Sequence, residues 1–240
     1  MKSFKWAVAI PAFNPDEQLL QLLDDLSSSR NDCLLLIVND GSSAESQKYL
    51  QLATAKNCCA VIEHTRNLGK GRALKSAFAY LLEKHPQIAG VVTADCDGQH
   101  SAEDILRCLD LLEKNPDCFI LAERKFDSSS MPLKSRCGNY LAKFIFRNLF
   151  KLDLRDTQCG LRGIPRDFME IMTDKPGERY EFESLMLLTA NSKRGKKTFP
   201  IKMFSIEARY FNGNRGSHFR KIRDSLKVVY ILLKSYFNGR

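Results

Sequence analysis

Near the start of the chain stands the apolar run Trp6-Ala-Val-Ala-Ile-Pro-Ala-Phe13, which predicts a buried β-strand that ends near Pro11. From Asp16 to Ser28 the leucines recur at helical spacing, so a helix is expected to follow at once. The apolar run from Leu34 to Val38 predicts a second buried strand. Strands and helices then continue to alternate. Further strands are expected at 60–64, 90–94 and 118–122. A helix is expected to follow the turn at 39–43 and to end near residue 55, and two more are expected at 71–84 and 102–114.

This alternation predicts an α/β fold with a mainly parallel, Rossmann-like central sheet, because short and continuously apolar strands need helices on both faces. In such sheets ligands bind where the loops after the carboxyl ends of the strands converge. Three of these loops carry polar or acidic residues, and they begin at Pro11, Asn39 and Asp95. An aromatic-rich helix is also expected at 140–150 and an amphipathic helix at 217–237.

The composition is that of a globular protein, since 44% of the 240 residues are hydrophobic and 27% are charged. This length predicts one catalytic domain, at 1–210, and a basic appendage, at 211–240. The charge is uneven, because residues 193–240 hold 13 Lys and Arg against two acids, whereas the first 192 residues hold 24 bases and 26 acids. The basic end therefore indicates a polyanionic partner.

The eight cysteines show no zinc-site spacing and no CxxC pair, and the N-terminal residues contain no apolar leader. A reducing, cytoplasmic location with free thiols is therefore expected. The longest apolar runs are six residues, whereas a membrane-spanning helix needs roughly 20. Any membrane contact is accordingly expected to be peripheral, on the cytoplasmic face.

Two carboxylates stand close together in Thr93-Ala-Asp95-Cys-Asp97-Gly-Gln99-His100, directly after an expected strand. Both can turn toward one point where the chain leaves the sheet. Hard oxygen ligands of this kind suit Mg²⁺ or Mn²⁺, which keep positions open for water and substrate phosphates. A solvated Asp turn is the alternative, but the two companion loops favour a metal that neutralises a diphosphate leaving group.

Six motifs follow one another along the chain: Ile10-Pro-Ala-Phe-Asn14, Val38-Asn-Asp-Gly-Ser42, Arg66-Asn-Leu-Gly-Lys-Gly-Arg-Ala73, Asp95-Cys-Asp-Gly-Gln-His100, Asp156-Thr-Gln-Cys-Gly-Leu-Arg162 and Tyr180-Glu-Phe-Glu183. In order and spacing this set resembles the family 2 glycosyltransferases of GT-A fold, and within them the polyprenyl- or dolichyl-phosphate sugar synthases. The resemblance covers roughly residues 6–237. It implies an inverting transferase that moves a sugar from a GDP- or UDP-sugar to a polyprenyl-phosphate-type lipid.

The resemblance also implies roles for individual residues. The metal is expected at Asp95, Asp97 and Gln99, with Asp97 essential for catalysis. The residues expected to bind the nucleotide sugar at the first three loops are Pro11, Ala12, Phe13, Asn14, Asp40, Asn67 and Lys70. Asp40 is placed to accept hydrogen bonds from the base or ribose, although a plain turn is its alternative. Lys70 follows glycines that allow close backbone approach at a helix start, where it can reach a phosphate.

Three arginines, Arg124, Arg136 and Arg162, stand in segments that face the donor or acceptor phosphates in the family. A guanidinium group suits two-point contact with such anions, and a solvated surface arginine is the alternative. The phosphate role is preferred for Arg162, which lies inside one of the six motifs.

Glu181 and Glu183 stand where many family members carry the base that deprotonates a hydroxyl acceptor. A phosphate acceptor is already anionic and needs little deprotonation, so a helix N-terminal charge is the alternative for both. One departure concerns Asn14, which is followed by Pro15 where family members commonly have Glu. Guanine and uracil therefore both stay open as the donor base.

The expected helix at 217–237 combines an apolar stripe with five Lys or Arg residues, a pattern typical of helices that lie in an anionic membrane interface. Packing on the protein's own core is the alternative. For a lipid acceptor, a separate small membrane protein is an expected partner. The competing functions are transfer to a glycan or protein hydroxyl and nucleic-acid binding by the basic end. Nucleic acid is not expected, because the acidic loops would repel a phosphate backbone.

Overall fold

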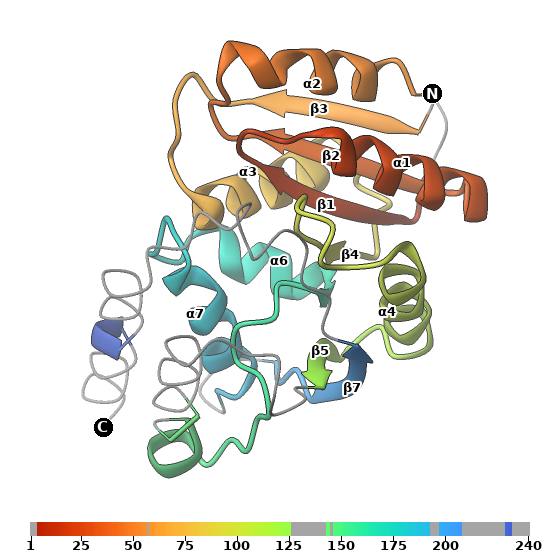
Figure 1. Cartoon of the computed structure of the whole chain (residues 1–240). Helices are drawn as coiled ribbons and strands as arrows, with labels where there is room; N and C mark the ends of the chain where they lie inside the picture. Colours follow the sequence, from red (N-terminus) through yellow and green to blue (C-terminus); the bar gives the residue numbers. More distant parts are fainter. Residues whose placement is uncertain are drawn as a thin grey trace.

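The computed structural model describes residues 4–56, 58–125, 143–144, 146–192, 197–207 and 229–231. At its centre lies a seven-stranded sheet with the strand order β3-β2-β1-β4-β6-β5-β7 (Figure 1). The strands are β1 (Trp6–Ala12), β2 (Cys33–Asn39), β3 (Cys59–Glu63), β4 (Gly90–Thr93), β5 (Phe119–Lys125), β6 (Arg162–Pro165) and β7 (Ile201–Glu207). The helices are α1 (Glu17–Ser29), α2 (Gln47–Thr54), α3 (Lys70–Lys84), α4 (Ala102–Lys114), α6 (Arg166–Thr173) and α7 (Glu181–Ala190), with a 3₁₀ turn at η1 (Ala44–Ser46).

The sheet is mainly parallel, as predicted. The first four strands pair in parallel, and β5 pairs in parallel with β7. Strand β6 is antiparallel to both of its neighbours, β4 and β5. Neither β6 nor β7 was predicted. The sequence of β6, Arg-Gly-Ile-Pro, contains no apolar run. All four residues are nevertheless buried, because β6 lies inside the sheet between β4 and β5.

Each face of the sheet is covered by its own set of helices, and the alternation of side chains along β1 shows how. Ala7 and Ala9 belong to the cluster that α3, α6 and α7 complete, whereas Trp6, Val8 and Ile10 belong to the cluster that α1, α2 and α4 complete. Both clusters are dense with apolar side chains, and each Val, Leu, Ile, Phe or Met among them stabilises the fold by about 1.5–3 kcal/mol when fully buried. The predicted cover on both faces is therefore confirmed.

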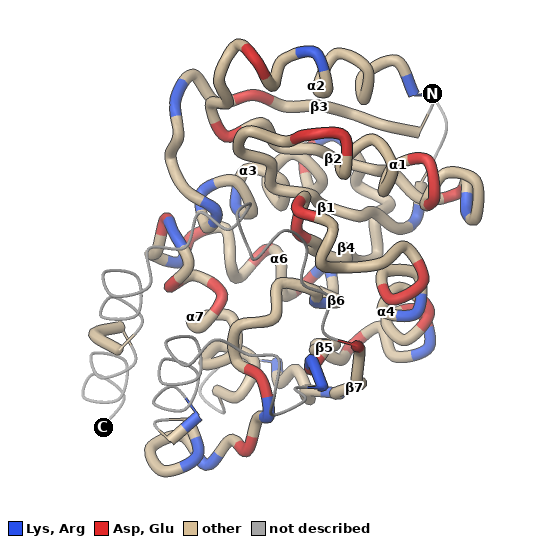
Figure 2. Tube along the Cα trace, in the orientation of Figure 1, with Lys and Arg blue, Asp and Glu red and all other residues tan. Residues whose placement is uncertain are grey.

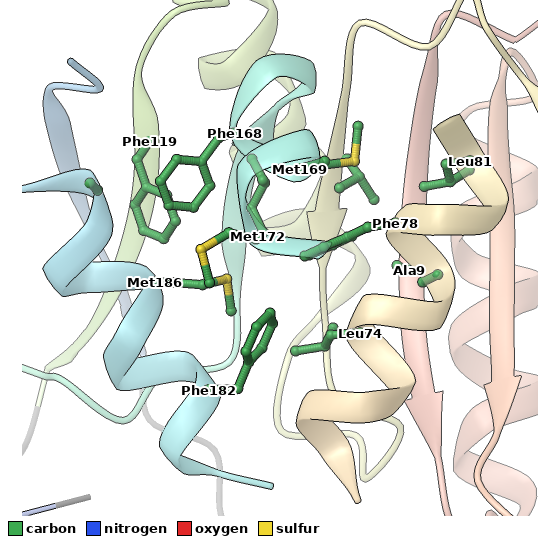
Figure 3. Close-up of a cluster of buried hydrophobic side chains, with 14 of the residues drawn as sticks. Ala9, Leu74, Phe78, Leu81, Phe119, Phe168, Met169, Met172, Phe182 and Met186 are labelled. Atoms are coloured by element: carbon green, nitrogen blue, oxygen red, sulfur yellow. The ribbon is translucent and has the colours of Figure 1, made fainter. Parts of the chain in front are cut away.

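The close-up in Figure 3 shows how the first cluster joins elements that are far apart in sequence. Phe78 of α3 packs near Phe182 of α7, with ring centroids 6.4 Å apart. Phe168 of α6 meets Phe119 of β5 edge-on at 5.2 Å. Phe182 thus packs the start of α7 against α3, and it also lies close to Gly71 at the start of α3, which is where the candidate site lies.

In the described part of the chain, no helix is both long enough and apolar enough to cross a bilayer. The seven cysteines in that part are free thiols. Most of the expected helix at 217–237, the expected domain boundary near residue 210 and Arg136 lie outside the described residues. Within the expected helix at 140–150, residues 143–144 and 146–150 are helical.

Candidate active site

The loops that follow β1 and β2 are tied together at the carboxyl edge of the sheet. Asn14 donates its backbone N–H to Ser42 Oγ at 2.9 Å, and its side-chain Oδ1 accepts from the backbone N–H of Ser43 at 2.8 Å. Asn14 has φ 53°, in the left-handed region that asparagine tolerates better than most residues. Of the expected pocket residues, Pro11 and Phe13 are half-buried. Ala12 packs instead into the core beside α1, which corrects its expected place in the pocket wall.

Asp40 is buried, and both of its carboxylate oxygens are used inside the protein. Oδ1 accepts from the backbone N–H of Leu68 at 2.9 Å, and Oδ2 accepts from that of Gly69 at 2.8 Å. Oδ1 also lies 2.7 Å from His64 Nδ1. This geometry corrects the expectation of a base or ribose contact: Asp40 holds the loop that leads into α3.

His64 is a residue that the sequence reasoning missed. Its Nε2 lies 2.9 Å from Ser76 Oγ, so the imidazole bridges Asp40 to the middle of α3. His64, Asp40 and Ser76 are far apart in sequence, and no spacing pattern connects them. The bridge adds a second link between the β2 edge and the helix that carries Lys70.

Lys70 is the first residue of α3, and its ammonium group lies at the centre of the site. Nζ is 2.6 Å from Asp95 Oδ1 and 2.9 Å from Glu183 Oε1. Burial alone would lower the pKa of Lys70, but the two carboxylates raise it well above its usual value, so the side chain stays protonated. Figure 2 shows basic and acidic residues gathered where the starts of α3 and α7 meet.

Asp95 and Asp97 follow β4 directly, as expected, and their pKa values move in opposite directions. Burial acts to raise the pKa of Asp95, but the positive charge of Lys70 brings it down to about 2. Burial, together with the nearby charge of Asp95, raises the pKa of Asp97 to about 6. Gln99 stands beside them and donates Nε2 to Asp97 Oδ2 at 2.7 Å. The three expected metal ligands are thus close together on one loop.

Gly160 lets the carboxylate of Asp95 pack directly against the backbone, where a side chain would not fit. A Cβ atom at this position would lie 2.6 Å from Asp95 Oδ2 and 2.8 Å from Lys70 Nζ, closer than any real Cβ contact. The donor set also fits a divalent cation: it offers hard oxygens from two carboxylates and one amide, and a cation would relieve the repulsion between the carboxylates. Among the described residues, no group of three or more His, Cys, Asp or Glu is placed to hold a metal ion.

His100 supports this loop from within the core. Its Nδ1 accepts from the backbone N–H of Asp95 at 3.1 Å, and its Nε2 lies 3.8 Å from Cys159 Sγ. Burial lowers the pKa of His100 to about 4, so the ring is neutral at neutral pH. A neutral ring can accept the Asp95 N–H, and His100 therefore positions the first carboxylate.

Arg124 forms a two-point ion pair with the fully buried Asp156, with Nε 2.6 Å from Oδ2. Burial opposes ionisation of Asp156, but Arg124 lowers its pKa below the usual value. The guanidinium charge also lowers the pKa of Asp95, which places Arg124 near the metal loop. The expected phosphate contact of Arg124 stays a prediction. Asp156, its ion-pair partner, had no expected role.

The expected phosphate contact of Arg162 is wrong. The side chain is 0% exposed, and it donates to the backbone carbonyl oxygens of Cys159 at 3.0 Å, of Thr157 at 3.4 Å and of Glu183. Arg162 instead joins the segment that carries Gly160 to the start of α7, and so it fixes the distance between the two sides of the site.

This role predicts a large stability loss in Arg162→Met. The substitution removes all three guanidinium hydrogen bonds from a fully buried position, so the free energy of unfolding should fall by about 3 kcal/mol or more in a urea titration. Arg107→Met is the matched control, because Arg107 is exposed and donates to a single carbonyl, that of Ser205. The control should lose less than about 1 kcal/mol. Equal losses in the two variants would contradict the role given to Arg162.

The two glutamates of the last motif, Glu181 and Glu183, make different contacts in the structure. Glu183 is buried and pairs with Lys70, so it belongs to the site. Glu181 Oε1 accepts from the backbone N–H groups of Glu178 and Arg179, both at 3.2 Å, in the turn before α7. Glu181 therefore takes the helix N-terminal role that was its alternative. Asn67 Oδ1 accepts from Arg179 at 3.4 Å, which ties the α3 loop to the same turn.

Comparison with known proteins identifies the family. The model of glycosyl transferase family 2 matches residues 7–171. The chain belongs to glycosyl transferase family 2. An uncharacterized protein of Methanocaldococcus jannaschii is 32% identical over 78% of this chain and 82% of that protein. The UDP-N-acetylglucosamine–dolichyl-phosphate N-acetylglucosaminyltransferase of Methanococcus voltae is 26% identical over 93% of each chain. The resemblance to the branch that acts on polyprenyl phosphates is therefore confirmed.

The fold of this family 2 glycosyltransferase also has solved counterparts. A glucosyl-3-phosphoglycerate synthase from Mycobacterium tuberculosis, solved with Mn²⁺ and UDP-glucose, superposes with a TM-score of 0.69 at 16% identity, over 97% of this chain and 79% of that chain. This likeness confirms the GT-A fold that the motifs predicted.

Proposed function

We propose that this glycosyltransferase transfers a sugar, with inversion, from a UDP- or GDP-sugar to the phosphate of a polyprenyl-type lipid. The observation that carries the proposal is the cluster at the carboxyl edge of the sheet, where Asp95 and Asp97 lie beside Lys70 and Asp95 packs against Gly160. This cluster combines oxygen ligands for a cation with an ammonium group for a phosphate. The name of the Methanococcus voltae relative, which pairs a UDP-sugar with dolichyl phosphate, supports the same donor and acceptor classes.

In the proposed reaction, an oxygen of the acceptor phosphate attacks the anomeric carbon as the bond from that carbon to the donor diphosphate breaks. The nucleoside diphosphate leaves with the bonding electrons, and the configuration at the carbon inverts. Bound at Asp95, Asp97 and Gln99, Mg²⁺ or Mn²⁺ would neutralise the charge that grows on the leaving group. Lys70 can contact the same diphosphate from the start of α3, because its long side chain places a rotatable ammonium group there.

The ion pair of Glu183 favours a phosphate acceptor over a hydroxyl acceptor. A general base must be free to take a proton, but Glu183 Oε1 lies 2.9 Å from the Lys70 ammonium group. Glu181 uses Oε1 to accept from the turn before α7, and its Oε2 is buried without a hydrogen-bond partner among the described residues. A phosphate oxygen is already negative at neutral pH and needs no base. A lipid acceptor also implies work at a membrane surface, toward which the basic residues of 193–240 would be attracted. A small membrane protein as anchor stays a prediction.

The test combines donors and acceptors. The full chain is incubated with a panel of UDP- and GDP-sugars, Mn²⁺ or Mg²⁺, and polyprenyl phosphate in detergent, and both nucleoside diphosphate release and glycolipid mass are measured. One donor should give release that rises several-fold with the lipid phosphate, together with a product of matching mass. The same lipid without its phosphate should give no product. Release that does not respond to the lipid phosphate, or a product formed on the unphosphorylated alcohol, would overturn the acceptor assignment.

A further inference from the structure

The ammonium group of Lys70 contacts a carboxylate oxygen of Asp95, the residue through which a metal ion would also bind. Nζ lies 2.6 Å from Asp95 Oδ1, and Asp95 is the first of the two carboxylates that the proposed function assigns to the cation. An oxygen lone pair that accepts from a charged ammonium group is not free to coordinate a divalent ion. A metal ion that coordinates Oδ1 must therefore break or weaken the Lys70–Asp95 ion pair, and the other oxygen, Oδ2, packs against Gly160.

The ammonium group is held firmly in this position. Glu183 Oε1 forms a second ion pair at 2.9 Å, and the ring of Tyr180 lies 6.0 Å from Nζ. Only 15% of the Lys70 side chain is exposed, and only 8% of the Glu183 side chain. Water therefore screens these attractions weakly, so that a metal ion alone competes poorly with the lysine.

A diphosphate changes this balance because it offers the ammonium group a new anionic partner. The lysine side chain has a flexible four-carbon stem, so Nζ can move from Asp95 to a phosphate oxygen while α3 stays in place. The same phosphate oxygens would complete the coordination of the cation. Donor binding thus removes the competitor and adds ligands in one step.

We propose that Lys70 is an internal counter-cation that keeps Asp95 from binding a divalent metal tightly until a nucleoside diphosphate draws the ammonium group away. This inference rests on the proposed function, and it adds an order to it: the metal binds with the donor and not before it. Without the lysine charge, the carboxylates of Asp95, Asp97 and Glu183 lose the ammonium group that contacts two of them, and Arg124 nearby is already paired with Asp156. They should then attract a cation strongly even when no nucleotide is present.

The test measures Mn²⁺ affinity by electron paramagnetic resonance of the free ion, with no substrate turnover. In the absence of nucleotide, Lys70→Met should bind Mn²⁺ at least about tenfold more tightly than the natural chain. Lys70→Gln should do the same, and its amide can still donate to both carboxylates, so it supports the fold. Lys84→Met is the matched control: it removes the same charge from the same helix, at a side chain that is 56% exposed and paired with Glu83. Its affinity should stay within about twofold of the natural chain.

A second arm repeats the titration with UDP or GDP present. The natural chain should gain most of its Mn²⁺ affinity from the nucleotide, whereas the Lys70 variants should gain much less. Unchanged affinity in folded Lys70→Met and Lys70→Gln, beside nucleotide-dependent binding in the natural chain, would overturn the inference and leave the proposed function intact. No Mn²⁺ binding in any chain, even with nucleotide, would instead contradict the metal site of the proposed function.

Discussion

Asp97→Ala is expected to lower the rate of sugar transfer by about 10³-fold or more, because the variant loses one of two carboxylates for the cation that offsets leaving-group charge. Asp97 is half-buried, and burial together with the charge of Asp95 raises its pKa to about 6. A second carboxylate so close to Asp95 is electrostatically unfavourable unless a cation binds between the two. The measurement is the initial rate of nucleoside diphosphate release at saturating donor, with the lipid phosphate and Mn²⁺ present.

The control is Asp110→Ala on α4, where the carboxylate is 57% exposed and pairs with Arg30 at 3.4 Å. Its transfer rate should stay within about twofold of the natural chain, because exposed ion pairs contribute little. An Asp97→Ala enzyme that keeps a tenth or more of the natural rate would remove Asp97 from the site.

Gly160→Ala is expected to lower transfer by about 10²-fold, since displacements of about 1 Å in a catalytic group cost that much. The new methyl group would lie 2.6 Å from Asp95 Oδ2 and 2.8 Å from Lys70 Nζ. Both atoms are at the ends of side chains, so they can move aside and the fold should survive. The expected result is therefore low activity with a melting temperature close to that of the natural chain.

Gly41→Ala provides the contrast. At Gly41 the φ angle is +70°, and an added Cβ atom would lie 2.2 Å from the backbone carbon of Arg66. Backbone atoms cannot swing away, so this variant should lose stability as well as activity. If Gly160→Ala lost stability to the same extent as Gly41→Ala, or kept its activity, the account of the close packing of Asp95 against Gly160 would be wrong.

The parts of the fold that could be predicted are those where the physical signal is local. Buried parallel strands such as Leu34 to Val38 read as continuous apolar runs, and the leucines of α1 repeat at helical spacing. Strand β6 carries no such signal, because its residues are buried by neighbours from distant parts of the chain. Strand β7 has an alternating and partly exposed pattern at the sheet edge, which a search for continuous apolar runs does not detect.

The candidate site divides in the same way. Asp95, Asp97 and Gln99 lie on one loop after one strand, so their proximity follows from sequence spacing alone. The pairing of Lys70 with Glu183 joins residues 113 positions apart, and only the packing of α7 against α3 brings them together. The motif around Arg162 was noticed, but residue type could not show that its guanidinium group points inward to backbone carbonyls. Asp40 was misassigned for the same reason, because the backbone N–H groups that it accepts from follow a different strand.

The central claim is that Asp95 and Asp97 hold a divalent cation against the diphosphate of a bound nucleotide. The most direct measurement is an anomalous difference map from crystals of the natural chain grown with Mn²⁺ and UDP or GDP. The account predicts one strong manganese peak within about 2.5 Å of carboxylate oxygens of both residues and of a nucleotide phosphate oxygen. A nucleotide bound at the carboxyl edge of the sheet with the manganese elsewhere, or with no manganese peak, would contradict it.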